Sequence, residues 1–413
     1  MKKTTLNRRE FLKLSSASLA AGVLLPRSLS QQIFSTAKPD FPADVLICIF
    51  LRGGLDGLNA VVPYFEDAYY HNRPALAVQA ERALVLDDRF GLHPALQPLL
   101  DIWHAGELAV VHAVGSPDPS HSHFEAQDYM ERGVPGDKSV TDGWIGRHLE
   151  SAPWVNPSLF RALGMGAAVP SSLRGKEPVV AMRSIAGFQL VGDPENAALV
   201  RELVSDLYHG DGLLAQTARD TFNALDVLST VDVDSYSPAG GAVYPESPFA
   251  SELNQVAQMM RAQIGLEAVC LDLGGFDTHA GQGGADGDLA DLLAEFAAAL
   301  AAFYQDLRAA GQAFTVVVMS EFGRRLAENA SGGTDHGHGG VMFALGPAVL
   351  GEKVHTEWPG LEADSLYGPG DLAVTIDFRD VLGELLVKRL GNPDGLEVVF
   401  PGHQPVFPGV FRA

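Results

Sequence analysis

The run Val45-Leu46-Ile47-Cys48-Ile49-Phe50-Leu51 leads directly into Arg52-Gly53-Gly54-Leu55-Asp56-Gly57. Seven apolar residues without polar alternation are typical of a strand that is buried on both faces of a parallel sheet. Three later runs have a similar character, namely Val110–Val114, Ala268–Leu273 and Phe314–Met319. The sequence therefore predicts an α/β fold, in which a mostly parallel central sheet is sandwiched by helices.

The segments between these runs predict one domain over residues 44–413, with a helical insertion at about 151–245. Helical patterns occur around Ala197–Leu207 and Leu213–Leu228, and we expect this insertion to cover the sheet. The clearest amphipathic helix is Leu289–Ala310, which Gly311 ends. A short strand is predicted at Met342–Leu345.

Polar residues follow each of the four apolar runs. Because the carboxyl ends of parallel strands meet at one edge of a sheet, these residues have a physical reason to converge. Carboxylate and imidazole groups together suit Zn²⁺, Mn²⁺ or iron better than a purely Ca²⁺ site. The candidate metal ligands are Asp56, Asp277, His279, Glu321, Asp335, His336 and His338.

Each candidate also has a structural interpretation. Asp56 lies among glycines, where Asp is favoured because it caps turns. Asp277 and His279 are two positions apart, so they point the same way in an extended loop, although a plain surface loop remains an alternative. Arg324 either neutralises Glu321 or, like Arg52, binds an anionic oxygen of a substrate.

Ser122 begins the sequence Ser-His-Phe-Glu, which is a capping box in which Ser122 and Glu125 exchange hydrogen bonds at a helix start. A Ser at a helix N-terminus is also well placed as an attacking oxygen, because the helix dipole favours negative charge there. The flanking His121 and His123 are candidates for outer hydrogen-bond donors or a base, or belong to a polar loop.

Residues 1–30 resemble a twin-arginine export signal, with Arg8-Arg9 before Phe11-Leu12-Lys13 and a weakly apolar stretch from Leu14 to Leu25. That stretch is short for a membrane span of about twenty residues. Residues 31–43 are predicted to be a linker. We therefore expect a periplasmic or extracellular protein that meets the twin-arginine translocase during export and has no stable membrane span once the signal is removed.

The chain of 413 residues has a formal net charge of −22. This balance argues against nucleic acid as a partner, because nucleic acid demands clustered Lys and Arg. The two cysteines, Cys48 and Cys270, lie in predicted strands and are expected to be buried, unpaired thiols.

Five motifs together resemble one family of exported bacterial proteins. They are Gly-Gly-Leu-Asp-Gly-Leu-Asn, Ser-His-Phe-Glu-Ala-Gln-Asp-Tyr-Met-Glu, Phe-Asp-Thr-His, Ser-Glu-Phe-Gly-Arg and Gly-Thr-Asp-His-Gly. In this order they look like the DUF1501 family, over roughly residue 44 to the C-terminus. That family is similar to the alkaline phosphatase and sulfatase superfamily, whose members bind one or two divalent metals at the strand ends.

The resemblance implies roles for individual residues. It implies that Asp56 is the first metal ligand, Ser122 the nucleophile and Asp277 a later carboxylate ligand, with Asp335-His336 as the pair of a second metal site. The spacing departs from the superfamily pattern, since Asp277-Thr278-His279 replaces Asp-x-x-x-His. Glu321 also occupies the place directly after its strand, so that either Glu321 or Asp335-His336 supplies the second site.

These observations predict a metal-dependent hydrolase of phosphate or sulfate esters with an alkaline phosphatase-like fold. The attacking group is Ser122 or a hydroxide supplied by the metal, and Arg52 or Arg324 clamps the anionic ester of a small molecule or polymer. The metal is Zn, Mn, Mg or Ca. The alternatives are a non-catalytic exported protein that keeps the fold, and a metal-dependent oxidoreductase.

Overall fold

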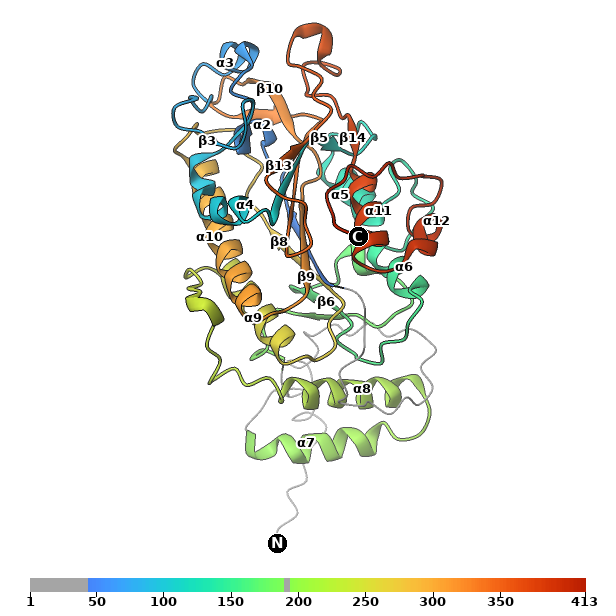
Figure 1. The fold of residues 1–413 in the computed structure, drawn as a ribbon. Helices are drawn as coiled ribbons and strands as arrows, with labels where there is room; N and C mark the ends of the chain where they lie inside the picture. The colour runs from blue at the N-terminus through green and yellow to red at the C-terminus, as the bar shows by residue number, and fades with distance from the viewer. Residues whose placement is uncertain (1–43, 189–193) are drawn as a thin grey trace.

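The computed structural model describes residues 44–188 and 194–413, and a nine-stranded sheet forms its centre (Figure 1). The predicted signal and linker at residues 1–43 lie outside the described residues. Across the sheet the strands are β13 (Lys353–His355), β5 (Leu108–Gly115), β12 (Gly340–Leu345), β9 (Phe314–Met319), β1 (Val45–Leu51), β8 (Ala268–Leu273), β6 (Ala162–Met165) and β7 (Val180–Met182), with β14 (Ile376–Asp377) beside β5.

The sheet is mixed and mostly parallel, as predicted. β1 pairs in parallel with both β8 and β9, and β6 continues the parallel order beyond β8. Only β12 runs against its neighbours β5 and β9. β5, β9, β1 and β8 therefore point the same way, and the loops that follow them leave from one edge of the sheet.

Helices cover both faces of the sheet, and the alternation of side chains along β1 shows why. Ile47, Ile49 and Leu51 belong to the core beneath α9 (Pro248–Arg261) and α10 (Asp288–Ala309). Leu46, Cys48 and Phe50 belong to the core beneath α6 (Trp144–Ser151) and α11 (Phe378–Lys388). Because both faces of β1 are buried, its run of seven apolar residues has no polar position.

The remaining elements lie around this sandwich. The other helices are α2 (Gly57–Ala60), α3 (Asp67–Asn72), α4 (Leu100–His104), α5 (His123–Arg132), α7 (Pro194–Leu207), α8 (Leu213–Leu228) and α12 (Leu396–Val399). Two small sheets pair β10 (Arg324–Glu328) with β11 (Thr334–His336), and β4 (Gly91–Leu92) with β2 (Val61–Val62) and β3 (Leu84–Val85). The 3₁₀ turns are Pro94–Leu99, Ser171–Leu173, Ala239–Gly241, Ala363–Ser365 and Pro393–Gly395.

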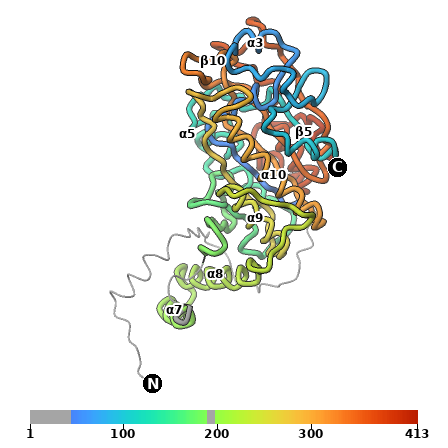
Figure 2. Tube along the Cα trace, turned by 90° about the vertical axis from the view of Figure 1, so that its left-hand side faces the viewer, coloured from blue at the N-terminus to red at the C-terminus, as the bar shows by residue number. Residues whose placement is uncertain are grey.

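The range predicted as an insertion, 151–245, includes two strands of the central sheet, β6 and β7. The part that stands outside the sheet is the hairpin of α7 and α8, whose two helices match the predicted helical patterns. The hairpin lies beyond the α9 end of the sheet and does not cover either face (Figures 1 and 2). α8 packs on the core through Ala224 and Leu228, and α7 lies outside it.

Two further expectations concern the cysteines and the membrane. Cys48 and Cys270 are buried free thiols, as predicted. Within residues 44–188 and 194–413, no helix combines the length and the apolar character that crossing a bilayer requires.

Candidate metal centre

Three imidazoles and one carboxylate converge where the loops after β5, β8 and β9 meet. The Nε2 atoms of His279 and His336 each lie 3.1 Å from Oδ1 of Asp277. Nε2 of His123 lies 3.5 Å from the same oxygen, and the two Nε2 atoms of His279 and His336 are 2.9 Å apart. In tetrahedral zinc sites with bonds near 2.0–2.1 Å, ligand atoms are about 3.3 Å apart, and these four spacings are of that order. Ligand atoms of His123, Asp277 and His336 all lie within 4.8 Å of one another.

Each of the three imidazoles presents Nε2 because an oxygen holds its other nitrogen. Nδ1 of His123 lies 2.8 Å from Oε1 of Glu321, and Nδ1 of His279 lies 3.2 Å from Oδ1 of Asp335. Nδ1 of His336 lies 2.9 Å from the carbonyl oxygen of His121. An oxygen acceptor keeps the proton on Nδ1 and leaves the Nε2 lone pair free, which is how ligating histidines are usually oriented.

The free lone pairs fit a cation. With protons on Nδ1, the Nε2 atoms of His279 and His336 face each other at 2.9 Å with no proton between them, which is repulsive unless a positive charge lies nearby. Nε2 of His123 is buried and has no hydrogen-bond partner. The donor set of three imidazoles and one carboxylate suits Zn²⁺, Mn²⁺ or Fe²⁺.

Asp277 is held as a carboxylate by the buried guanidinium of Arg324. Burial alone would raise the pKa of Asp277, but the hydrogen bond and the positive charge of Arg324 lower that pKa below its usual range. Nη2 of Arg324 lies 2.8 Å from Oδ1 of Asp277. Asp277 is therefore a carboxylate at neutral pH, which is the form that binds a cation.

Arg324 also joins the loops that carry the centre. Its side chain is fully buried and donates to the carbonyl oxygens of Gly54 at 2.7 Å and Phe276 at 2.9 Å. It donates to Thr334 at 2.8 Å and to Gly53 as well. One guanidinium thus fixes the loops after β1, β8 and β10 relative to one another. These contacts explain the buried position of Arg324 without any role in binding a substrate anion.

Gly53 allows two of these loops to touch. It has φ +119°, and a β carbon there would lie only 2.4 Å from the backbone nitrogen of Asp277. Any other residue would push the β1 loop away from Asp277.

Asp277, His279 and His336 are the predicted ligands that the structure brings together. Two other predicted ligands contact the imidazoles instead of the candidate metal position. Glu321 contacts Nδ1 of His123, and Asp335 contacts Nδ1 of His279. Glu321 is buried and accepts additional hydrogen bonds from the Gly53 backbone and from Gln127. Asp335 also accepts from Asn329, a bond that lowers its pKa.

Asp56 lies elsewhere in a buried polar network. Its Oδ2 accepts from Arg73 at 2.7 Å and from Gln282 at 2.6 Å, and both ionic side chains are fully buried. Its Oδ1 accepts from the backbone N–H of Asn59 and caps α2. Donors thus surround the carboxylate, as in the turn-capping interpretation of the sequence.

The Asp56→Ala variant is expected to lose about 3–5 kcal/mol of unfolding free energy, because it leaves the Arg73 charge buried without its partner. Its bound metal per folded chain should stay unchanged. Urea unfolding and elemental analysis measure the two quantities, with the exposed pair Arg82–Asp286 as control. Asp286→Ala should leave the free energy of unfolding nearly unchanged, because solvent screens an exposed ion pair. A well-folded Asp56→Ala protein without metal would instead make Asp56 a ligand.

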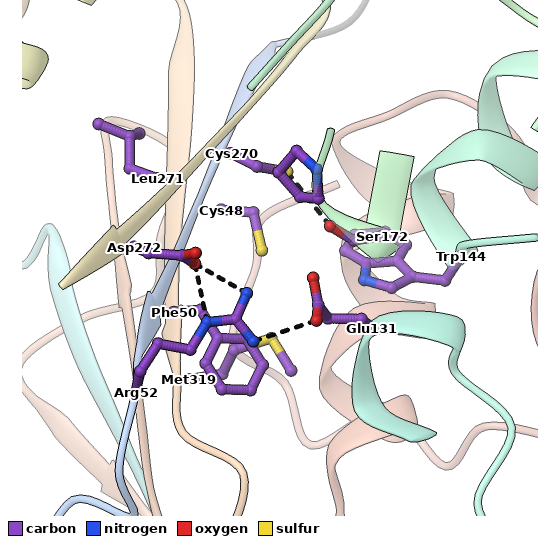
Figure 3. Close-up of a pocket in the computed structure, with 11 residues that line it drawn as sticks. Cys48, Phe50, Arg52, Glu131, Trp144, Ser172, Cys270, Leu271, Asp272 and Met319 are labelled. Atoms are coloured by element: carbon purple, nitrogen blue, oxygen red, sulfur yellow. Dashed lines mark hydrogen bonds and ion pairs between the residues drawn. The ribbon is translucent and has the colours of Figure 1, made fainter. Parts of the chain in front are cut away.

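His338 and Arg52 also lie apart from the four ligand atoms. His338 is buried, stacks on Tyr367 at a centroid distance of 4.5 Å, and has its pKa lowered to about 4 by burial. Arg52 is bound to Glu131 and Asp272 and lies beside a small cavity with both cysteines (Figure 3). Neither Arg52 nor Arg324 has a guanidinium free for a substrate anion.

Ser122 is the N-cap of α5 by position, but the predicted capping box is wrong. The Ser122 side chain makes no capping hydrogen bond. Glu125 pairs instead with Lys138 and with the Ser120 hydroxyl. Ser122 is exposed and directly precedes His123, so its hydroxyl lies next in the chain to a candidate ligand.

His123 is the candidate ligand that the sequence does not single out. In the sequence it is a candidate only for an outer hydrogen-bond donor, a base or part of a polar loop. The signal available was its position beside Ser122 after a buried strand, but His121 shares that signal. Only the direction in which α5 begins separates the two residues.

Parts of several solved structures resemble this chain. The C-terminal periplasmic domain of EcEptC from Escherichia coli, solved in complex with Zn, matches with a TM-score of 0.39 and 10% identity, over 91% of this chain and 92% of that chain. A 2-O GAG sulfatase matches with a TM-score of 0.31 and 10% identity, over 76% of this chain and 66% of that chain. The lipoteichoic acid synthase LtaP from Listeria monocytogenes matches with a TM-score of 0.29 and 11% identity, over 88% and 79%.

Scores this low carry no information about activity, so the chemistry must be read from the side chains of this chain. Among curated proteins, none matches it in sequence. The family model described as "Protein of unknown function (DUF1501)" matches residues 43–385. The chain therefore belongs to the DUF1501 family.

Proposed function

We propose that this chain is a metal-dependent hydrolase of phosphate or sulfate esters, in which His123, Asp277, His279 and His336 hold the metal. The observation that carries the proposal is the convergence of three Nε2 atoms on Oδ1 of Asp277, each imidazole being oriented by an oxygen on its far side. A divalent cation at such a site neutralises an anionic ester and lowers the pKa of an attacking oxygen.

The centre is open to solvent, which supports a reactive rather than a structural site. The side chain of Asp277 is 48% exposed and that of His279 is 42% exposed. Structural zinc sites are closed, whereas reactive sites leave room for water or substrate. A substrate ester can therefore reach the ligand atoms without rearrangement of the core.

Ser122 is our candidate nucleophile. It stands at the start of α5, a helix of ten residues, where the dipole favours negative charge on an attacking oxygen. Its hydroxyl is not used to cap the helix. Because Arg52 and Arg324 are engaged elsewhere, the first backbone N–H groups of α5 are the better candidates to hold the remaining oxygens of the ester.

The test is hydrolysis of an aryl phosphate, a phosphate diester and an aryl sulfate by the purified chain with Zn²⁺, Mn²⁺ or Mg²⁺. We expect at least one ester to be cleaved, and a chelator to stop the reaction. In Ser122→Ala the rate should fall by about 10³-fold or more if Ser122 attacks, since a nucleophile that acts with its site is rarely replaceable. An unchanged rate would assign the attack to water, and no cleavage with any metal would contradict the proposal.

The donor set also supports a second candidate function. Imidazoles with one carboxylate are common ligands of iron in redox enzymes, so a metal-dependent oxidoreductase fits the same four residues. Elemental analysis of protein from its native compartment separates the two. Stoichiometric iron together with no ester hydrolysis would favour redox chemistry.

We further propose that the protein acts outside the cytoplasm after twin-arginine export, because residues 1–30 carry the paired arginines and short apolar core of such a signal. Replacing Arg8 and Arg9 by Lys is expected to keep the protein in the cytoplasm. Cell fractionation checks this, and export of the double variant would contradict it.

A further inference from the structure

A large apolar side chain is exposed to solvent beside the candidate metal centre. Phe124 is the second residue of α5, directly after the candidate ligand His123 and two positions after Ser122. It is 87% exposed, the highest value among the exposed large apolar side chains of the described residues. Phenylalanine is usually buried, although single exposed apolar residues do occur on protein surfaces. The position of Phe124 therefore decides whether its exposure has a function.

The fold does not use the ring of Phe124. This residue belongs to none of the three hydrophobic clusters that the described residues form. α5 is buried at other positions, namely Ala126, Tyr129, Met130 and Glu131. A second phenylalanine beside the centre, Phe322, is 4% exposed, and its ring lies 5.0 Å from that of His123 and 4.7 Å from that of His336. Phe322 thus supports two candidate ligands, whereas Phe124 leaves its ring free for a contact from outside.

The geometry of α5 directs Phe124 toward the place where we propose that the ester binds. In a helix every Cα–Cβ bond tilts toward the N-terminus, so the β carbon of Phe124 points toward the turn that begins at Ser122. The same turn carries the backbone N–H groups proposed to hold the ester oxygens. His123 reaches the candidate centre from this turn as well. An ester held there lies close enough for its organic part to contact the ring of Phe124.

The cations that follow Phe124 in the chain are closed into ion pairs. Lys138 pairs with Glu125, and Nη2 of Arg132 lies 2.7 Å from Oδ1 of Asp128. Neither cation is therefore free to bind a second anionic group of a substrate. The formal net charge of −22 also repels a polyanionic polymer. The surface around Phe124 thus favours an apolar contact over a second anionic one.

We propose that Phe124 is a specificity-determining residue, and that its ring contacts an aromatic or other apolar group on the alcohol part of the ester. The substrate class is then an ester of a small apolar alcohol rather than of a charged polymer. The inference rests on the proposed hydrolase function and names the part of the substrate that the metal does not hold. An apolar group against Phe124 gains from burial, and an aromatic group gains from ring pairing as well.

The experiment compares the binding of phenylphosphonate and methylphosphonate to the full chain loaded with Zn²⁺, by isothermal titration calorimetry. Both probes carry the same anionic group on a stable C–P bond, so they differ only in the apolar group. We expect the wild type to bind phenylphosphonate about tenfold more tightly, as one aromatic pair can supply. In Phe124→Ala this preference should largely disappear, while zinc content and methylphosphonate binding stay unchanged.

Phe124→Leu keeps an apolar side chain and should retain part of the preference. Phe407→Ala is the matched control, because Phe407 is also exposed but lies in the C-terminal tail beyond α12, so this variant should retain all of it. Equal binding of the two probes by the wild type, or an unchanged preference in Phe124→Ala, would overturn the inference and leave the proposed hydrolase intact. If the zinc-loaded wild type binds neither probe, both proposals are overturned.

Discussion

His336→Ala is expected to lose the metal of the centre and with it ester hydrolysis, by about a thousandfold or more. Nε2 of His336 lies 3.1 Å from Asp277 and 2.9 Å from Nε2 of His279, so it occupies one corner of the ligand set. Without His336, three of the four candidate ligands remain to hold the metal. The charge that the cation supplies to the transition state is worth several kcal/mol, and about 1.4 kcal/mol corresponds to each tenfold change in rate. Elemental analysis and the ester assay measure the two losses.

Asp335→Asn should cause a smaller loss of bound metal and of ester hydrolysis than His336→Ala. Asp335 contacts the candidate centre only through Nδ1 of His279, and loss of such an orienting group typically weakens metal binding 10–100-fold. His403→Ala is the control, because His403 lies with Asp380 in another hydrogen-bonded pair and should leave metal and activity unchanged. A His336→Ala protein that retains stoichiometric metal and full activity would remove His336 from the site.

Arg324→Met is expected to lower the free energy of unfolding by about 3–5 kcal/mol, the range seen when one partner of a buried charge pair is removed. The guanidinium is fully buried and donates to four carbonyl oxygens and to Asp277. Without it these oxygens lose their donor, and the loops that carry the ligands lose their common anchor. Urea unfolding measures the change, and metal affinity should fall with it, because Asp277 is no longer held.

Arg324→Lys should not rescue the protein, because one compact ammonium group cannot reproduce the planar fork that reaches several acceptors. Arg82→Met is the matched control. Arg82 forms an ion pair with Asp286, but its side chain is 49% exposed, so its loss should leave the free energy of unfolding nearly unchanged. A comparable small loss in Arg324→Met would show that the loops are held by other contacts.

The fold follows closely from the sequence where burial is complete. β1, β8 and β9 begin and end at the predicted residues, because these strands are covered on both faces, apart from the exposed Asp272 in β8, and their apolar residues stop where the loops reach solvent. The helices α7 and α8 were also predictable from their periodicity. The strands β6 and β7 were not, because runs of four and three residues are too short to show a period.

The candidate site was predictable only in part. The positions of Asp277, His279 and His336 after buried strands indicated that they would meet, and they do. Asp56 looked equally good in sequence, but it pairs with Arg73, seventeen positions later, and nothing local in the sequence indicates that contact. The role of Arg324 as a common anchor depends on carbonyl oxygens of four separate residues and has no sequence pattern at all.

By itself the sequence determined which segments are buried strands and that polar loops leave from their carboxyl ends, since the hydrophobic effect acts on each run according to its own composition. Only the tertiary structure decided which imidazoles face one point. That choice depends on the order of the strands across the sheet and on the direction of the first turn of α5, which places His123 in the centre and His121 beside Asp371. Metal coordination requires atoms to be positioned within fractions of an ångström, and such precision comes from contacts between distant segments, which no local pattern records.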